Sequence, residues 1–352
     1  MAKVTEPEVS LSKLSPKSKW ILGTYCVIAV LLTWQAILPF LAERRYRDGY
    51  NFDSEQRYKY AIEEYQKAIG YAPWEAQYQL DLARVYTDFA TQQTQLQDKL
   101  YYLNKAEEMS LRMIELDNKS PWYRNRLGSI YMTLAGLVPA RNQEYLQKAE
   151  ANIRAAADID NKNPLFQLNL AYFLHQMGRV DEAFEYYQKA IVFDERIPEA
   201  HYNLADLYIR KGNYDAALNE YILTAKSNQD FGRINVAIAD LCLMLYSRTQ
   251  NREYLQKAVP YMENELKKNS ADPKLLKNLG SIYTQDQKWG DAARVYDQYM
   301  IFHPEDTASV LGLYAQAVAN SGQKERIIVK LQRDLEINPL DSLAAQKLKS
   351  FR

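Results

Sequence analysis

Two consecutive stretches decide the fold: PLFQLNLAYFLHQMGRVDEAFEYYQKAIVFDERI at residues 164–197 and PEAHYNLADLYIRKGNYDAALNEYILTAKSNQDF at residues 198–231. The second repeats the first at a spacing of about 34 residues, the length of one two-helix repeat. Small residues such as Ala171 and Ala183 let two antiparallel helices approach closely, and Tyr187 fills the wedge between them. Each stretch therefore predicts a helical hairpin that buries its remaining apolar face only against neighbouring hairpins.

The two stretches resemble tetratricopeptide (TPR) repeats in the order and type of their key residues. The matching positions are Leu170, Ala171, Gly178, Ala183, Tyr187 and Ala190, followed by Leu204, Ala205, Tyr208, Gly212, Ala217 and Tyr221. Because TPR arrays serve many unrelated partners, the resemblance implies a fold and not a specific function.

Extending this register in both directions predicts an all-α protein, a right-handed TPR superhelix of about eight helix-turn-helix repeats. The expected repeats are 42–75, 76–120, 121–163, 164–197, 198–231, 232–272, 273–306 and 307–340, followed by a capping helix at 341–352. The eighth repeat matches the pattern weakly, as terminal repeats often do.

Three repeats are longer than the others. Their extra residues lie between the small residue of the first helix and the small residue of the second helix. The extra residues end alike, in YLNKA at 102–106 and in YLQKA at 145–149 and 254–258. We expect the second helix to start one or two turns early there. The longer turns project from one edge, either as binding surface or as solvated loops.

A single apolar segment, WILGTYCVIAVLLTWQAILPFL at residues 20–41, carries no charge. As a helix it is long enough for the roughly 30 Å hydrocarbon core of a bilayer. The alternative is a cleaved signal peptide, but the apolar run is longer than usual and no small-residue cleavage site follows it. We therefore expect an N-terminal tail at 1–19 and one transmembrane helix at 20–41 that runs almost directly into the repeats.

The charges flanking this segment are nearly balanced, with Lys3, Lys13, Lys17 and Lys19 before it and Arg44, Arg45 and Arg47 after it. Long domains translocate largely regardless of charge, so a short tail followed by a long domain favours an internal N-terminus. The predicted location is a bacterial inner (cytoplasmic) membrane with an extracytoplasmic solenoid; the opposite orientation remains open.

Composition and motifs argue against several function classes. The 44 basic and 44 acidic residues cancel, so no bulk field attracts nucleic acid. The three histidines lie in different repeats, and no phosphate-binding or nucleophile motif occurs. We therefore expect no catalytic residues, metal, cofactor or small-molecule substrate.

The family register predicts which side chains line a groove for a protein or peptide partner. These are Tyr46, Tyr50, Leu80, Arg84, Asn125, Leu168, Tyr172, His175, Tyr202, Asp206 and Arg210. Aromatic rings beside Arg and Asp suit an extended peptide, although the same mixture is ordinary on such grooves.

The mixture of long and regular repeats, two of which open on Pro-Trp (73–74 and 121–122), resembles the TPR tails of bacterial O-antigen ligase and polymerase-like membrane proteins. That resemblance implies a cell-envelope role, but the catalytic part of such enzymes is absent from this chain. The leading hypothesis is a membrane-anchored scaffold that recruits partner proteins. The alternatives are an accessory subunit of an envelope glycan enzyme and a fixed structural subunit of a larger membrane complex.

Overall fold

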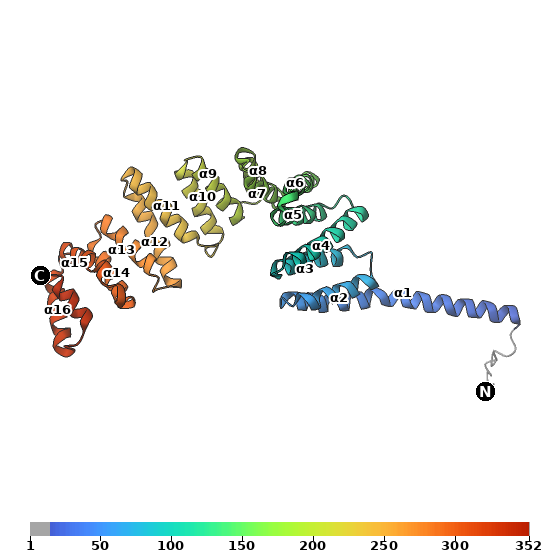
Figure 1. Ribbon diagram of the computed structural model, residues 1–352, viewed down its shortest axis with the longest axis horizontal. Helices are drawn as coiled ribbons and strands as arrows, with labels where there is room; N and C mark the ends of the chain where they lie inside the picture. Colours follow the sequence, from blue (N-terminus) through green and yellow to red (C-terminus); the bar gives the residue numbers. More distant parts are fainter. Residues whose placement is uncertain (1–14, 352) are drawn as a thin grey trace, which may run out of the picture. The chain divides into compact units, whose positions relative to one another are not determined.

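The computed structural model describes residues 15–351, without the side chain of residue 31. All regular structure in this range is helical: seventeen α-helices and short 3₁₀ turns follow one another along the chain (Figure 1). Successive helices pair as antiparallel hairpins, which confirms the predicted all-α solenoid of TPR type. The chain divides into two compact units, residues 1–170 and residues 171–352, and each is described by itself.

Unit 1 contains three complete hairpins and the start of a fourth. Its helices are α1 (Pro16–Ser54), α2 (Tyr58–Tyr71), α3 (Ala76–Gln92), α4 (Leu96–Leu116), α5 (Pro121–Leu137), η2 (Pro139–Arg141), α6 (Asn142–Ile159) and the first part of α7 (Pro164–Gln176).

Unit 2 continues from the end of α7. Its helices are α8 (Val180–Phe193), α9 (Pro198–Arg210), α10 (Tyr214–Ser227), α11 (Ile234–Thr249), α12 (Glu253–Lys268), α13 (Pro273–Gln285), α14 (Trp289–Phe302), η3 (Pro304–Asp306), α15 (Ala308–Asn320), α16 (Lys324–Ile337) and α17 (Ser342–Lys349).

Helix α1 contains both the apolar segment and the first helix of the first hairpin. It runs for 39 residues without a break, and Pro39 lies inside it. Ser15 caps its N-terminus by accepting a hydrogen bond from the Ser18 backbone N–H. The last residues of the predicted tail are therefore helical, whereas Lys3 and Lys13 lie outside the described residues.

The C-terminal part of α1 packs against α2 through small residues. Ala42 and Gly49 are buried, and a Cβ on Gly49 would lie 2.9 Å from a ring carbon of Tyr65. Tyr65 itself is fully buried. The absence of a side chain at residue 49 therefore sets how closely the two helices approach.

The three long repeats differ from the regular ones in both of their helices. Their first helices, α3, α5 and α11, have 17, 17 and 16 residues, against 13 in α7, α9 and α13. Their second helices, α4, α6 and α12, have 21, 18 and 16 residues, against 14 in α8, α10 and α14. The earlier start of the second helix was expected from the sequence, but the longer first helix was not.

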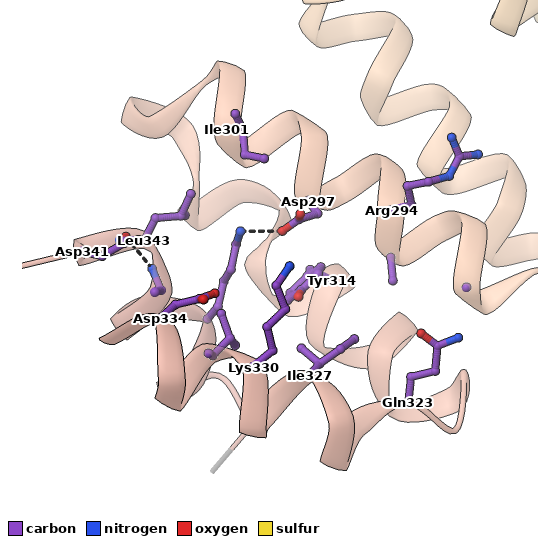
Figure 2. A pocket seen from close by; sticks show the side chains of 15 residues that line it. Arg294, Asp297, Ile301, Tyr314, Gln323, Ile327, Lys330, Asp334, Asp341 and Leu343 are labelled. Atoms are coloured by element: carbon purple, nitrogen blue, oxygen red, sulfur yellow. Dashed lines mark hydrogen bonds and ion pairs between the residues drawn. The ribbon is translucent and has the colours of Figure 1, made fainter. Parts of the chain in front are cut away.

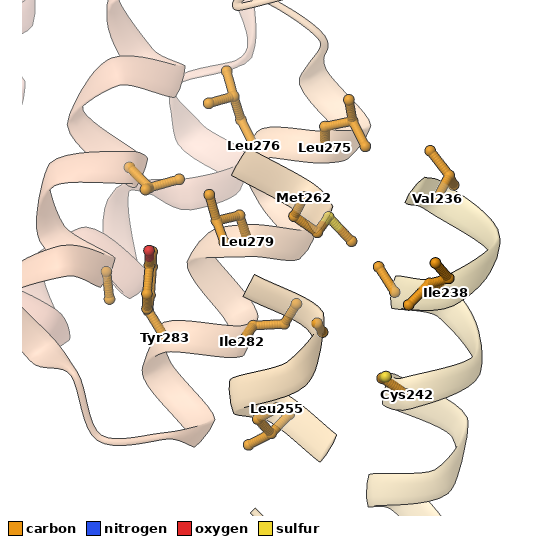
Figure 3. Close-up of a cluster of buried hydrophobic side chains, with 14 of the residues drawn as sticks. Val236, Ile238, Cys242, Leu255, Met262, Leu275, Leu276, Leu279, Ile282 and Tyr283 are labelled. Atoms are coloured by element: carbon orange, nitrogen blue, oxygen red, sulfur yellow. The ribbon is translucent and has the colours of Figure 1, made fainter. Parts of the chain in front are cut away.

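A continuous hydrophobic core runs from α9 to α15 in unit 2. Figure 3 shows its central part, where Ile238 and Cys242 of α11 lie near Leu255 and Met262 of α12 and near side chains of α13. Burial raises the pKa of the Cys242 thiol to about 12, so this cysteine behaves as a small apolar residue.

The end of unit 2 is less tightly packed. Helix α16 buries only Leu331, and the shorter helix α17, capped at its N-terminus by Asp341, follows it. Ile337 and Leu340 beside the last turn are largely exposed.

Candidate protein-binding surface

The side chains expected to line a groove lie on the first helices of successive hairpins, and the structure brings several of them into contact with a neighbouring first helix. Tyr46 and Tyr50 lie on α1, Leu80 and Arg84 on α3, and Asn125 on α5; Leu168, Tyr172 and His175 lie on α7, and Tyr202, Asp206 and Arg210 on α9. We call the set on α1, α3 and α5 the unit 1 face and the set on the end of α7 and on α9 the unit 2 face.

Arg84 is the centre of the unit 1 face. Its guanidinium pairs with Asp53 of α1 and also lies 3.0 Å from Asp88 Oδ2 and 3.8 Å from Asp81 Oδ1. Burial alone would lower the pKa of Arg84, but the hydrogen bond and charge of Asp53, with Asp88 and Asp81, raise it. The side chain of Asp53 is only 9% exposed, so this pair links α1 to α3 in a partly dry setting.

Tyr46 joins the same network from the other side. Its ring stacks on Tyr78 with centroids 4.6 Å apart, and its hydroxyl donates to Asp81 Oδ2 at 2.8 Å. Burial and the hydrogen bond to Asp81 raise the pKa of Tyr46, so its hydroxyl stays protonated. Tyr50, one turn further along α1, is 58% exposed and available for contact.

A second arginine, Arg126 of α5, faces the acidic residues around Arg84. Burial lowers the pKa of Arg126; Asp88 opposes this shift, and Arg84 adds to it. Its Nε is buried without a hydrogen-bond partner. Beside it, Asn169 Nδ2 donates to Asn125 Oδ1 at 2.9 Å, which links α7 to α5.

His175, Asp206 and Arg210 come together on the unit 2 face. Asp206 Oδ2 accepts a hydrogen bond from Arg210 Nε at 3.0 Å and lies 3.2 Å from His175 Nε2. The His175 contact lacks hydrogen-bond alignment. Burial lowers the pKa of His175; Asp206 opposes the shift and Arg210 reinforces it. The imidazole is therefore neutral near pH 7, and Asp206 carries the local negative charge.

The two tyrosines predicted on the unit 2 face have different surroundings. Tyr172 is 45% exposed. Tyr202 packs its ring against Tyr221 and Phe231, with centroids 5.3 and 5.4 Å away. Tyr172 is therefore accessible to a partner, whereas Tyr202 contributes mainly to packing.

Sequence reasoning missed the acidic partners in unit 1, Asp53, Asp81 and Asp88. A signal for one of them, Asp53, was present, because side chains on adjacent first helices meet at offsets close to one repeat. Arg84 contacts Asp53, 31 residues earlier, and His175 contacts Asp206, 31 residues later; Tyr46 and Asp81 are 35 residues apart. Scanning for opposite charges at an offset of 31 residues would have found the Asp53–Arg84 pair.

The other two histidines have structural partners. His201 is buried, with Nδ1 2.6 Å from Glu220 Oε2 and Nε2 2.9 Å from the backbone oxygen of Glu195. His303 Nε2 lies 2.6 Å from the backbone oxygen of Ala271. Within the described residues no cluster of His, Cys, Asp and Glu could hold a metal ion. Both faces combine fixed charges with exposed aromatic rings.

A cavity of about 470 Å³ lies near the end of unit 2, lined by α14, α15, α16 and α17 (Figure 2). Lys347 of α17 is buried in its wall and pairs with Asp297 of α14. Lys330 and Asp334 of α16 also line the cavity. The Lys347–Asp297 pair attaches α17 to α14.

Family models identify the repeats directly. Models described as TPR repeat or tetratricopeptide repeat match residues 174–212, 198–230 and 275–308. These stretches cover the second half of the expected repeat 164–197, nearly all of the repeat 198–231 and most of the repeat 273–306. Together with the paired helices they define the class of the protein, an α-solenoid built from tetratricopeptide repeats.

One curated relative and several solved structures are similar to parts of this chain. A TPR repeat-containing protein of Methanocaldococcus jannaschii is 27% identical over 202 residues, which are 52% of this chain and 34% of that protein. The chain thus spans about a third of this relative. A thermophilic TPR protein of Thermus thermophilus has 21% identity and a TM-score of 0.46, covering 57% of this chain and 99% of that one. Yeast Tom70 has 16% identity and a TM-score of 0.49, covering 90% of this chain and 58% of that one.

Proposed function

We propose that this protein is a membrane-anchored scaffold that binds partner proteins or peptides through the first helices of its repeats. The observation that carries the proposal is the continuity of α1. The same helix presents apolar side chains all round over residues 20–40 and then supplies Tyr46, Tyr50 and Asp53 to the unit 1 face. An anchor and a recognition surface therefore share one rigid element.

The exposed part of α1 has the properties of a membrane span. Among the described residues, α1 is the one helix long and apolar enough to cross a bilayer, and none of its most apolar window is buried within the protein. Trp20, Val30 and Leu32 are 80%, 68% and 60% exposed. Each large apolar side chain gains roughly 1.5 to 3 kcal/mol on leaving water, so a run of this length favours lipid strongly.

A signal sequence near the N-terminus has a similar composition, and the packing of α1 supports an anchor instead. Ala42 and Gly49 are buried against α2, so the helix turns that follow the apolar run belong to the folded repeats. Cleavage just after the run would cut one continuous helix at the point where its packing begins. We infer that the segment is retained.

We place the protein in a bacterial inner membrane with the solenoid on the extracytoplasmic side. The lysines before the apolar segment and the long domain after it support this orientation. The test is protease accessibility in intact cells or spheroplasts, with a tag after Arg352. Degradation from outside is the expected result; protection until lysis would reverse the orientation and leave the anchor itself intact.

Both faces combine exposed aromatic rings with charges that are already fixed in place. Tyr50 lies on the same face as the Arg84 network, and Tyr172 lies on α7 one turn before His175. Rings supply contact area at small entropic cost, and pre-positioned charges select the direction and register of a peptide. TPR repeats generally act in protein interactions, which agrees with this arrangement.

The binding test uses a photo-crosslinking amino acid placed at Tyr50 or Tyr172 in the full-length protein in cells. We expect a discrete adduct from each position, identified by mass spectrometry, and weakened adducts after Arg84→Ala or Asp206→Ala respectively. The matched controls are Lys67 and Lys189, exposed residues of the second helices α2 and α8. Equal labelling from all four positions would contradict a binding role for these faces.

The identity of the adduct also tests the proposed cell-envelope role. The likeness to the repeat tails of O-antigen ligase-like proteins stays a prediction. Crosslinking to a polytopic glycosyl transferase would favour an accessory subunit of a glycan enzyme over a general scaffold.

A further inference from the structure

We infer that the turn between α2 and α3, residues 71–75, docks in the headgroup layer of the same bilayer that α1 crosses, with Trp74 as an interfacial anchor. This inference rests on the proposed membrane anchoring. It adds a second contact between the protein and the lipid, on the repeat array itself.

The packing of the first hairpin places this turn beside the end of the apolar segment. Helix α2 runs antiparallel to α1, and Ala42 forms a buried cluster with Ala68, Ala72 and Tyr78. The Tyr78 hydroxyl also donates to Glu43 Oε2 at 3.3 Å. Residues 72–78 are therefore level with residues 42–43 along the axis of α1.

The length of the apolar segment places that level at the membrane surface. Residues 20–41 rise roughly 33 Å as a helix, against a hydrocarbon core of about 30 Å. The headgroup layers add roughly 5 to 7 Å on each side of that core. Residue 42 thus leaves the hydrocarbon at the headgroup boundary, and the turn that packs against it lies in that layer.

The residues of the turn suit this environment. Trp74 is 63% exposed, although it is one of the largest apolar side chains in the protein. Tyr71 lies beside it, and Arg44 is exposed on the adjoining part of α1. Tryptophan and tyrosine concentrate at bilayer interfaces because their rings are apolar and their N–H and O–H groups can stay hydrated.

The opposite end of the same hairpin has a different composition. The turn between α1 and α2 reads Ser54, Glu55, Gln56 and Arg57, all polar. It lies about 20 Å further along α1 from residue 41, well beyond the headgroup layer. The apolar turn is therefore at the membrane end of the hairpin and the polar turn at the aqueous end.

A second contact away from the helix axis has a mechanical consequence. A single spanning helix leaves the attached domain free to rotate about the membrane normal and to tilt. A lipid contact at Trp74 fixes the tilt of the first hairpin and therefore the direction in which the unit 1 face points.

The experiment uses the full-length protein with Cys26→Ala and Cys242→Ala, reconstituted into phosphatidylcholine vesicles. Nitroxide labels are attached singly at Val30→Cys in the span, Glu75→Cys beside Trp74 and Glu55→Cys at the aqueous end. Collision with a water-soluble nickel reagent and with oxygen reports the depth of each label. The Glu75 label is measured again after Trp74→Ser.

We expect the Glu75 label to be severalfold less accessible to nickel than the Glu55 label, and Trp74→Ser to remove most of that difference. Equal nickel accessibility at 75 and 55, with residue 30 in hydrocarbon, overturns the docking of the turn and leaves the anchor standing. Protection at 75 that survives Trp74→Ser overturns the role of Trp74. An aqueous label at residue 30 overturns the anchor and this inference together.

Discussion

The two parts of helix α1 have the same backbone structure and opposite surroundings. Over residues 20–40 large apolar side chains point outward on all sides, with Trp20, Val30 and Phe40 each more than two-thirds exposed. Over residues 42–54 the helix is amphipathic: Ala42 and Gly49 are buried, while Arg44 and Arg47 are exposed. The proposed anchoring would have lipid solvate the first part, whereas the second part packs on another helix.

This difference shows that helix length alone does not define a structural module here. Under the proposed anchoring, the helix passes from lipid to water without a change in secondary structure. Only the distribution of side chains around the helix axis marks the boundary, near residue 41. The following predictions test whether the two parts can be disrupted independently.

The largest effect is expected from charges in the first part. Val27→Arg with Val30→Arg should release the protein from membranes, because each arginine near the centre of a span costs about 2.5 to 3.5 kcal/mol. Membrane fractionation after carbonate extraction measures the release. The melting temperature of the repeats should stay unchanged, since Val27 and Val30 are 59% and 68% exposed.

The next effect concerns the ion pair that links the second part of α1 to α3. Arg84→Met should destabilise the protein by about 2 to 3 kcal/mol, because it leaves the Asp53 carboxylate poorly solvated and without its main partner. Denaturant unfolding in detergent measures the loss, and membrane fractionation should not change.

Two further variants sharpen this result. Adding Asp53→Asn to Arg84→Met should recover part of the lost stability. Arg47→Met removes an exposed pair with Glu43 on α1 and should change stability by less than about 0.5 kcal/mol. If Arg47→Met proves as costly as Arg84→Met, burial is not the reason for the effect.

The two glycines of α1 provide a matched pair. Gly49→Val should cost about 1 to 3 kcal/mol, because its Cβ would lie 2.9 Å from the Tyr65 ring. Gly23→Val should leave stability nearly unchanged, since no heavy atom lies within 4 Å of a Cβ there. Thermal unfolding followed by circular dichroism separates the two. Similar losses in both variants would mean that the two parts of α1 are not packed differently.

The smallest predicted effect is a loss of folding stability at acidic pH. Glu64 of α2 lies 3.0 Å from Arg45 of α1 and 2.6 Å from Lys67. Burial alone would raise the pKa of Glu64, but its hydrogen bonds to Lys67 and Arg45 lower it. Because the pKa of Glu64 is lower in the folded protein, its carboxylate stabilises the fold at pH values above the unfolded-state pKa, near 4.3. This stabilisation is lost as the pH falls through the folded-state pKa.

Thermal melts between pH 6 and pH 3 check this dependence. The wild-type protein should lose more stability on acidification than Glu64→Gln does. Membrane attachment should not respond to pH in this range, since residues 20–41 carry no charge. A pH slope that Glu64→Gln leaves unchanged would assign the acid sensitivity to other carboxylates.

Much of the fold was predictable from the sequence because its contacts form within one hairpin or between neighbouring hairpins. The 34-residue spacing, the small residues at helix crossings and the tyrosines in the wedges each report on packing within one hairpin or between neighbours. Tyr187, which the sequence places in the wedge between two helices, is completely buried. A repeat array has few long-range contacts, so sequence pattern carries most of the information.

The candidate faces were predicted less completely, since they depend on contacts between repeats. Family register selects Tyr46, Arg84 and Asp206, but it does not show that Arg84 is already paired with Asp53. The family register also treats Tyr172 and Tyr202 alike, although the ring of Tyr202 is the one that packs against Tyr221 and Phe231. Whether a side chain is free to bind depends on neighbours that lie a repeat away or beyond a turn.

A cysteine accessibility scan along α1 tests the central claim most directly. Single cysteines at each position from 20 to 54, in a Cys26→Ala and Cys242→Ala background, are labelled with a membrane-impermeant maleimide in vesicles. We predict no labelling over residues 20–41, followed immediately by labelling with a helical period that spares Ala42, Tyr46 and Gly49. Labelling within the apolar run, or a fully labelled stretch between Leu41 and Tyr46, would contradict a single helix that both crosses the membrane and forms part of the first repeat.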